Sequence, residues 1–324
     1  MSTNLAVEAH GLIKRYGRTT ALHGIDLEVA AGTVTAVLGP NGAGKTTAVR
    51  ILTTLCDADE GEALVAGFNV RTQSNEVRRR IGLAAQDATV DPLLTGRENL
   101  VMLAELHQLA RSVAASRAAQ LLDEFSLADA ADRKVAGYSG GMRRRLDLAA
   151  TLVAHPQVLF LDEPTTGLDP RARADLWVVI DTLVDHGTTV VLTTQYLEEA
   201  ERLADDIVVV DHGRVIAQGD ARTLKRAVGG DQVHVVVVDA TRLPEARRIL
   251  AEVTGADAAV EVATRAVTAP TGRGVETLVV AAAALADAGI VVDDLGLRQP
   301  SLDEVFLTLT GSASAETETR KEIA

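Results

Sequence analysis

The sequence is poor in cysteine, aromatic residues and positive charge, and each shortage excludes a class of protein. Cys56 is the only cysteine among 324 residues, so no intrachain disulfide can form. A reducing compartment fits this usage, and we expect the Cys56 thiol to be a small buried side chain. Aromatic residues make up 2% of the chain, so the core must consist of Ala, Val and Leu. The net charge of −13 argues against a nucleic-acid partner, which attracts clustered Lys and Arg.

Long apolar runs are also missing. The longest, residues 277–286, is too short to span a bilayer and is followed directly by Asp287. Residues 1–9 do not combine a basic segment with an apolar core, so we expect no signal peptide. If the protein works at a membrane, we expect another chain to supply the membrane spans.

Short β-rich runs alternate with helical patterns over the first two thirds of the chain, which predicts an α/β fold. A helix is expected over residues 45–55, and a helical subdomain over about 87–150, where β-branched residues are few. The turn 211–213 predicts a hairpin between its flanking strands. Strands are expected at 25–29, 33–38, 81–85, 158–161, 189–192, 207–210 and 214–217.

The composition shifts after Gly229-Gly230, where we expect a second domain. The expected boundaries are 1–228 for the first domain and 229–311 for a small α+β domain, with a disordered tail over 312–324. Strands at 232–238, 258–263, 265–268 and 290–297, with helices at 244–252 and 275–288, give the order βαββαβ, a ferredoxin-like arrangement.

A short helix is expected over residues 301–309, with Ser301 as its N-cap and Glu304 completing a capping box. Its apolar stripe, spaced as on one helix face, either closes the small domain's own core or docks on a partner. Both readings stay open. The stripe consists of Leu302, Val305, Phe306 and Leu309.

A glycine-rich loop between a predicted strand and a predicted helix matches the phosphate-loop pattern G-x-x-x-x-G-K-[ST]. Its glycines let successive backbone N–H groups face phosphate oxygens, and the helix N-terminus adds positive charge. Lys45 is expected to reach the β- and γ-phosphates, and Thr46 to ligate Mg²⁺. A turn without any ligand is the alternative. The loop consists of Gly39, Pro40, Asn41, Gly42, Ala43, Gly44, Lys45, Thr46 and Thr47.

An apolar strand at 158–161 runs into two adjacent acids, Asp162 and Glu163. Buried strands seldom end in paired carboxylates unless the strand end faces a site or a cation. We expect Asp162 to hold the metal ion and Glu163 to accept a proton from the attacking water. A solvated strand end is the alternative.

A third motif, Tyr138-Ser139-Gly140-Gly141-Met142, precedes a helical run. Alone it is a turn with Ser139 as a helix cap, but before the acidic strand it resembles the signature of ATP-binding cassette (ABC) proteins. The resemblance covers most of the chain, in the family's order. Four further residues match positions of the family. Tyr16 matches the aromatic that stacks on adenine, and Gln86 matches the glutamine of the lid. Asp169 matches the dimer loop, and Gln195 matches the switch residue.

This resemblance implies a P-loop cassette that works as a head-to-tail homodimer with two nucleotides at the interface. Ser139, Gly140 and Gly141 would face the nucleotide held by the opposite protomer, and Gln86 would join Thr46 and Asp162 as a metal ligand. Tyr16 would stack on adenine, with a core aromatic on an N-terminal strand as the alternative. The cofactors implied are ATP and Mg²⁺, and GTP stays open.

Two positions depart from the family pattern. Met142 replaces a glutamine and can only pack, since a thioether is a weak acceptor. Gln195 replaces the switch histidine, so its amide can donate to a γ-phosphate oxygen but cannot become cationic. We therefore expect slower hydrolysis of the nucleotide, with Glu163 as the base and Gln195 as the second catalytic residue.

Segments 138–149, 193–200 and 300–310 resemble the ATP-binding subunits of the daunorubicin/doxorubicin resistance type. The implied role is drug export and self-resistance with a separately encoded ABC-2-type permease, on the cytoplasmic side of the cell membrane. A soluble cassette ATPase of translation or DNA repair is one alternative. Another is the ATPase of a transporter with a different substrate, because the permease selects the cargo.

Overall fold

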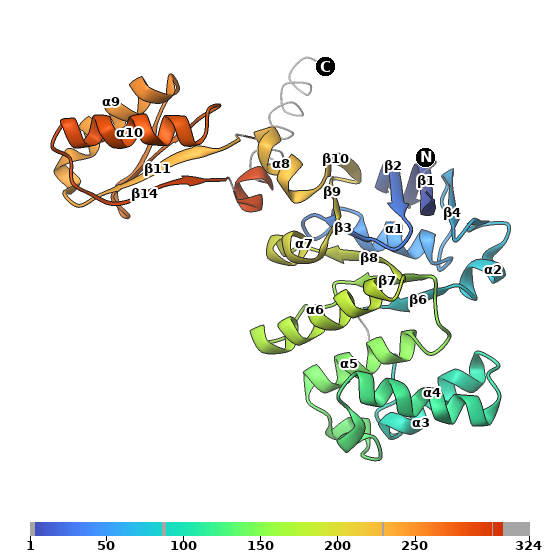
Figure 1. Ribbon diagram of the computed structural model, residues 1–324. Coiled ribbons are helices and arrows are strands. Elements are labelled where there is room, and N and C mark those ends of the chain that lie inside the picture. Colours follow the sequence, from blue (N-terminus) through green and yellow to red (C-terminus); the bar gives the residue numbers. More distant parts are fainter. Residues whose placement is uncertain (1–3, 86–88, 229, 300, 307–324) are drawn as a thin grey trace. The chain divides into compact units, whose positions relative to one another are not determined.

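The computed structural model describes residues 4–85, 89–228, 230–299 and 301–306. The chain divides into two compact units, Met1–Gln218 and Gly219–Ala324 (Figure 1). The boundary predicted from the sequence, after residue 228, lies at the other end of helix α8 (Ala221–Val228). Among the described residues, no helix is long and apolar enough to cross a membrane.

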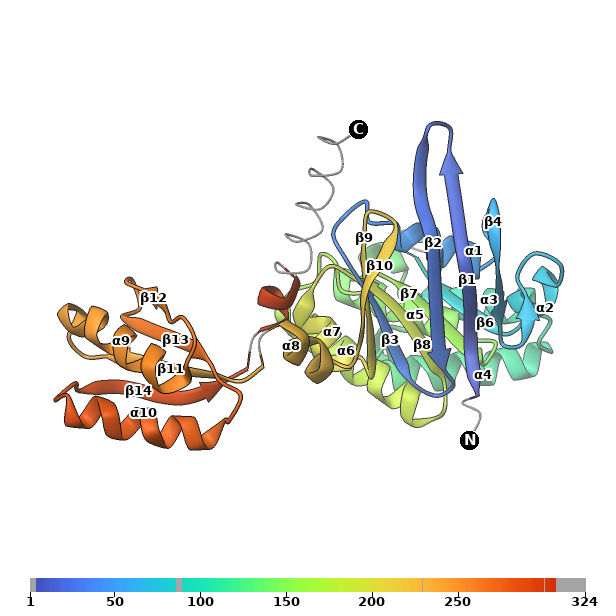
Figure 2. The same ribbon diagram turned by 90° about the horizontal axis from the view of Figure 1, so that it is seen from above.

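An antiparallel sheet begins unit 1. Strands β1 (Leu5–Tyr16) and β2 (Thr19–Ala30) form the long hairpin seen in Figure 2, and β4 (Glu60–Val65) and β5 (Phe68–Asn69) extend it in the order β2-β1-β4-β5. The sequence predicted only the second half of β2, where Ile25, Leu27 and Val29 alternate with exposed residues. In the rest of the hairpin the pairing register shifts at several places. These shifts interrupt the alternation of buried and exposed residues by which a strand is predicted from sequence.

A six-stranded sheet follows, in the order β10-β9-β3-β8-β7-β6. The pairs among β3, β6, β7, β8 and β9 are parallel, and every residue of β3, β7 and β8 is buried. Such strands are continuous apolar runs because both faces of the sheet are covered. The strands are β3 (Val34–Leu38), β6 (Ile81–Ala84), β7 (Val158–Asp162), β8 (Thr189–Thr194), β9 (Asp206–Asp211) and β10 (Arg214–Gly219).

The ends of the helices in this unit are set by capping residues and by residues with a left-handed backbone conformation. Helix α1 (Lys45–Leu52) ends before residue 55, the predicted end, because Thr54 has a left-handed φ of 63°. Asp169 caps α6 (Pro170–Asp185), and Pro170 occupies its first turn. This part of the unit also contains two short helices, α2 (Ser74–Arg78) and α7 (Leu197–Leu203).

Helices also occupy the region between β6 and β7, where the sequence predicts them. They are α3 (Gly96–Leu106), α4 (Arg111–Glu124) and α5 (Gly140–Thr151), drawn in green in Figure 1. Thr95 and Glu98 form a capping box at the start of α3.

Unit 2 has the predicted βαββαβ order, with an antiparallel sheet ordered β12-β13-β11-β14. The two helices of this order, α9 and α10, pack into one core with the strands, through residues such as Val235, Ile249 and Leu285. This topology supports the ferredoxin-like assignment, which stays a prediction. The elements are β11 (Gln232–Val237), α9 (Leu243–Thr254), β12 (Ala259–Glu261), β13 (Ala266–Pro270), α10 (Val275–Asp287) and β14 (Val292–Arg298).

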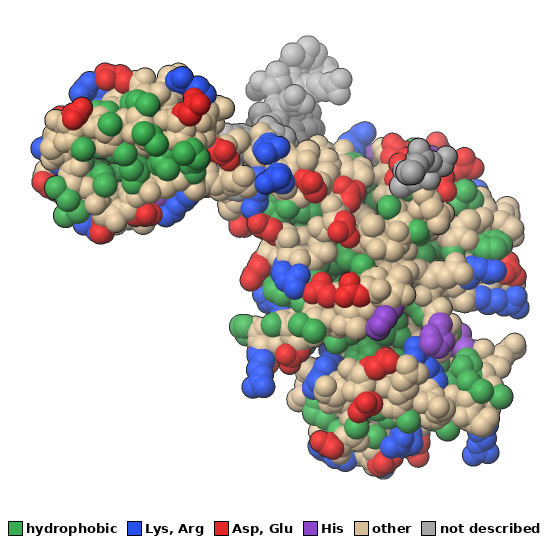
Figure 3. Space-filling view, in the orientation of Figure 1, with side chains coloured by type: hydrophobic (Ala, Val, Ile, Leu, Met, Phe, Trp, Pro, Cys, Tyr) green, Lys and Arg blue, Asp and Glu red, His purple; other side chains and the backbone are tan. Residues whose placement is uncertain are grey.

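The longest apolar stretch of the sequence is accounted for by α10. One face packs into the core of unit 2, and another carries the exposed Val275, Val279 and Val280, where hydrophobic side chains gather on the surface (Figure 3). After β14, Ser301 and Glu304 form the predicted capping box, with hydrogen bonds of 3.2 Å and 3.1 Å. Leu309 and the tail lie outside the described residues.

Candidate functional site

The glycine-rich loop leaves β3 and enters α1 at Lys45, as predicted. Gly42 and Gly44 have φ angles of 83° and 108°, which L side chains rarely adopt. A Cβ at Gly44 would also lie 2.7 Å from Leu22 Cδ2 and 2.8 Å from Ala21 O, and one at Gly39 would collide with Val210 O. Packing therefore demands glycine at Gly39 and Gly44, and the backbone conformation favours it at Gly42, independently of any ligand.

Lys45 is 4% exposed and lies at the centre of the site. Its Nζ donates to Gly39 O at 2.8 Å and Pro40 O at 3.1 Å, and lies 3.4 Å from Glu163 Oε1. The structure thus brings together two motifs that are 118 positions apart (163 − 45) in the sequence. A buried ammonium group needs such partners, because burial without them is costly.

Asp162 ends β7 and is buried. Its Oδ1 accepts hydrogen bonds from Thr193 Oγ1 at 2.6 Å and from Thr46 Oγ1 at 3.2 Å. Two of the three predicted metal ligands, Thr46 and Asp162, therefore meet. Thr193, which the sequence did not single out, orients the carboxylate. Only the pairing of β7 with β8 places Thr193 there.

This pair fits Mg²⁺, which prefers oxygen ligands and is commonly bound through one or two carboxylates together with substrate phosphates. Among the described residues, no group of three or more His, Cys, Asp or Glu could hold a metal ion. A cation at Thr46 and Asp162 would therefore depend on oxygens from elsewhere, such as phosphate. Gln86, the third predicted ligand, lies outside the described residues.

Glu163 has a left-handed φ of 49°, which is unusual for a residue with a Cβ. Its backbone N–H donates to Thr193 O and Thr193 Oγ1, both at 3.1 Å. Its carboxylate lies between Lys45 and Thr166, whose Oγ1 donates to Oε2 at 3.3 Å. Strained residues of this kind cost about 1–3 kcal/mol and cluster at functional sites.

The signature motif and the dimer loop lie side by side. Ser139 caps α5 by accepting from Met142 N at 3.2 Å, and Asp169 caps α6 by accepting from Ala172 N at 2.9 Å. The two helix starts approach closely, since a Cβ at Gly141 would lie 3.3 Å from Ala172 Cβ. Both motifs line one hollow of about 380 Å³, together with Gly140, Arg145, Gly167, Leu168, Arg171 and Asp175.

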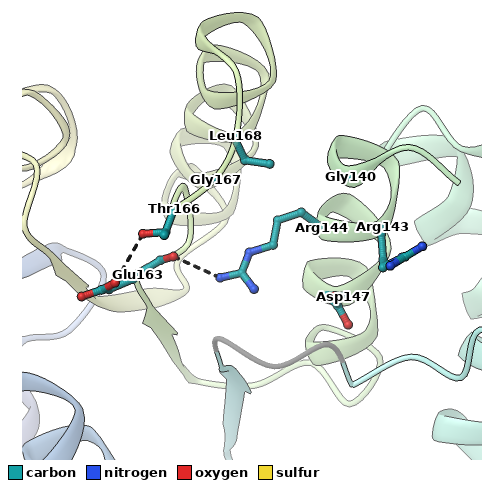
Figure 4. A pocket seen from close by; sticks show the side chains of 8 residues that line it. All are labelled: Gly140, Arg143, Arg144, Asp147, Glu163, Thr166, Gly167 and Leu168. Atoms are coloured by element: carbon teal, nitrogen blue, oxygen red, sulfur yellow. Dashed lines mark hydrogen bonds between the residues drawn. The ribbon is translucent and has the colours of Figure 1, made fainter.

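A second hollow, of about 430 Å³, joins α5 to the acidic strand end (Figure 4). Glu163 and Thr166 line one side, and Arg144 and Asp147 of α5 line the other. The sequence offered no signal for these two α5 residues, because Arg and Asp on a helix ordinarily face solvent.

Tyr16 and Cys56 lie near each other, with Tyr16 Oη 3.9 Å from Cys56 Sγ. Tyr16 is 47% exposed, which disagrees with the alternative of a core aromatic. Cys56 is half-buried at the edge of the core, so the expectation of a buried thiol was wrong. Its loop follows the early end of α1 and stays near the surface.

Gln195 comes directly after β8 and is half-buried. The last residue of β8, Thr194, accepts at its carbonyl oxygen a hydrogen bond of 3.2 Å from Gly39 N, at the start of the loop. The chain therefore leaves the sheet next to the glycine-rich loop, where a switch residue is expected.

The family described as "ABC transporter" matches residues 22–166. The chain is 52% identical to the daunorubicin resistance ATP-binding protein DrrA2 of Streptomyces coeruleorubidus, over 98% of each chain. This chain belongs to the ABC transporter ATP-binding proteins. The cassette is also 47% identical to the daunorubicin/doxorubicin resistance ATP-binding protein DrrA of Streptomyces peucetius, over 98% of this chain and 96% of that protein.

Two further likenesses concern the cassette. The Nod factor export ATP-binding protein I of Burkholderia thailandensis is 42% identical over 72% of this chain and 77% of its own length. A solved dimer of an ATP-binding cassette in a post-hydrolysis state, bound to ADP and Pi, has a TM-score of 0.61 and is 26% identical. It covers 67% of this chain and 99% of its own.

Proposed function

We propose that this chain is the ATP-hydrolysing subunit of a drug exporter that serves efflux and self-resistance. As an ABC transporter ATP-binding protein of this type, it is an ATPase coupled to transport. The observation that carries the enzymatic part is the cluster in which Lys45 contacts Glu163 while Thr46 contacts Asp162. The names of the relatives that match nearly the whole chain support the export of drugs of the daunorubicin class.

The residues of the cluster divide the work of phosphoryl transfer. Lys45 and the loop N–H groups would bind the β- and γ-phosphates, and Tyr16 would stack on the base. Thr46 and Asp162, with Gln86, would hold Mg²⁺, which when bound neutralises charge on the phosphates. Glu163 would accept the proton of the attacking water, and the Gln195 amide would donate to a γ-phosphate oxygen.

We also propose that two copies complete the site. Ser139, Gly140 and Gly141 of one protomer would face the nucleotide held by the other, with Asp169 in the contact between them. In support, these residues line one hollow and both caps lie at helix N-termini, which favour anions. Hydrolysis would then occur only in the closed dimer, away from bulk water.

A separate permease of the ABC-2 type would complete the transporter, with this chain bound at the cytoplasmic side of the membrane. Its cargo is open, because a cassette 42% identical to this one is named for Nod factor export. A transporter with another substrate is therefore the second candidate function.

The test is drug transport by the chain co-expressed with a candidate ABC-2-type permease from the same genome. Inverted membrane vesicles should accumulate doxorubicin when ATP is supplied, and vesicles carrying Glu163→Gln should not. Asp129→Asn, which changes an exposed carboxylate, is the matched control. ATP hydrolysis without doxorubicin uptake would point to another substrate, and absence of ATP hydrolysis would refute the proposal.

A further inference from the structure

Arg144, in the second turn of α5, reaches across the hollow to the backbone around the acidic strand end (Figure 4). Its Nε donates to Pro164 O at 2.8 Å, its Nη2 to Glu163 O at 3.4 Å, and its Nη1 to Ala85 O at 2.9 Å. One side chain thus holds the backbone after β7 and the backbone after β6 at once.

Only arginine suits this position. Its planar guanidinium carries five N–H donors in a fixed fork, whereas a lysine ammonium is a compact point charge on a flexible stem. Burial lowers the pKa of Arg144, and the nearby carboxylates of Asp147, Asp162 and Glu199 oppose that shift. A guanidinium keeps its charge in proteins, so these carboxylates face a cation that is partly removed from water.

Asp147, nearly one turn later on α5, holds a neighbouring stretch of backbone. Its Oδ1 accepts from Thr89 N at 2.8 Å and from Val90 N at 3.2 Å. The helix that begins at the signature Ser139 is therefore tied to Ala85, to Thr89 and Val90, and to the catalytic Glu163 itself. A rigid helix with these attachments cannot shift without moving them.

We infer that Arg144 is a positioning residue that couples the two nucleotide sites of the dimer. It links the signature helix, which faces the partner's nucleotide, to the backbone of Glu163 in its own site. This inference rests on the proposed dimer and deepens it. A nucleotide bound at Ser139 would draw α5 into place and, through the Arg144 fork, set the carboxylate of Glu163 for its own reaction.

Arg117, on α4, provides a matched control within the helical region. It is half-buried, as Arg144 is, and its Nη2 donates to a backbone carbonyl, Leu152 O at 2.9 Å. It lines neither the hollow beside Glu163 nor the hollow at the signature motif. A general effect of losing a half-buried arginine should therefore appear equally in both variants.

The experiment compares Arg144→Lys, Arg144→Gln and Arg117→Lys in the full-length chain. ATP hydrolysis is measured against ATP concentration, and binding of a fluorescent ATP analogue is measured separately. We expect the parent to be sigmoidal, and both Arg144 variants to lose about 10- to 100-fold in kcat with a Hill coefficient near one. Their affinity for the analogue should stay within about two-fold, since no Arg144 atom is assigned to the loop. Arg117→Lys should retain the parent's values.

Each other outcome refutes the coupling role. Parent-like kcat and Hill coefficient in either Arg144 variant would show that the fork is dispensable. Non-sigmoidal hydrolysis by the parent, or unfolding of both Arg144 variants in circular dichroism, would leave a purely structural residue. A parent that hydrolyses no ATP would instead overturn the proposed function on which this inference rests.

Discussion

At the scale of single residues, the site is a set of charges that satisfy one another across the sheet. Lys45 and Glu163 are both buried and lie 3.4 Å apart, so each offsets part of the cost of burying the other. Asp162 is held by two threonine hydroxyls. Removing one partner would leave the other buried without compensation, so each variant below is compared with the parent in melting temperature as well as in binding or rate.

Lys45→Ala is expected to abolish productive ATP binding, because no other side chain of the loop supplies positive charge to the phosphates. A charge-assisted hydrogen bond contributes about 1.5–3 kcal/mol, or roughly 10- to 150-fold in affinity. Equilibrium binding of a fluorescent ATP analogue measures this loss. Lys134→Ala, at an exposed lysine, should bind like the parent. Unchanged affinity in Lys45→Ala would exclude the loop as the phosphate site.

Glu163→Gln should bind ATP and accumulate as a dimer, because the amide preserves shape but cannot accept the proton. Loss of one catalytic base lowers rates by about 10²–10⁴. Hydrolysis assays and size-exclusion chromatography with ATP report the two effects. A variant that hydrolyses ATP at the parent's rate would remove Glu163 from the role of base.

Substitutions at Gln195 test whether the switch residue needs a positive charge for ATP hydrolysis. Gln195→Ala should lower the hydrolysis rate by up to about 100-fold, since one donor to a developing charge is lost. Gln195→His should retain or raise the rate and make it depend on pH near 6.5, where imidazole titrates. Equal rates in the parent and Gln195→Ala would mean that this chain has dispensed with the switch.

At the scale of elements, strand ends and helix starts supply nearly all the site residues. The loop and α1, the acids at the end of β7 and the Ser139 cap of α5 were predictable because each motif is local and its residue types carry their own geometry. The sequence pointed to Asp169 through the family resemblance, and its role as the cap of α6 came from the structure. Helix α7, just after Gln195, adds a feature that no motif signals. Its Glu199 is fully buried and accepts a hydrogen bond of 3.4 Å from Trp177 Nε1.

Glu199 should make stability depend on pH. Burial raises the pKa of its carboxyl, so above its ordinary value of 4.5 the folded chain binds more protons than the unfolded chain. This contribution to stability is therefore fully present below pH 4.5 and is lost as the pH rises through the raised pKa. Glu199→Gln should melt at a higher temperature relative to the parent at pH 7.5 than at pH 5.

Melting curves at the two pH values measure this effect, at about 2–4 °C for each kcal/mol in a domain of this size. Glu198→Gln, at the exposed neighbour, is the control and should show no such trend. A difference between Glu199→Gln and the parent that is the same at both pH values would disprove the prediction.

At the scale of the whole molecule, the open question from the sequence is the role of the short helix after β14. Leu302 and Val305 are 2% and 1% exposed in the single chain, which favours a stripe that already packs within it. Phe306 is half-buried. If the stripe were a docking surface for a partner, these side chains would instead be exposed in the single chain.

Leu302→Ala is expected to destabilise the chain by about 2–5 kcal/mol, the usual effect of truncating a buried leucine. Differential scanning calorimetry should resolve this loss, and Asp303→Ala, at an exposed position of the same turn, should show none. Unchanged melting of Leu302→Ala together with lost dimerisation or lost drug transport would favour the docking reading.

The sequence by itself determined the family, the α/β core, the order of elements in unit 2, the residues of the loop, the two acids and the Ser139 cap. These are local patterns, in which spacing along the chain implies spacing in the element. Only the tertiary structure decided that Thr193 orients Asp162, that Arg144 holds Glu163 and Ala85, and that Tyr16 and Cys56 lie near the surface. Such contacts depend on which strands are neighbours in the sheet and on how the helices pack across them. The periodicity of residues along the chain does not specify either arrangement.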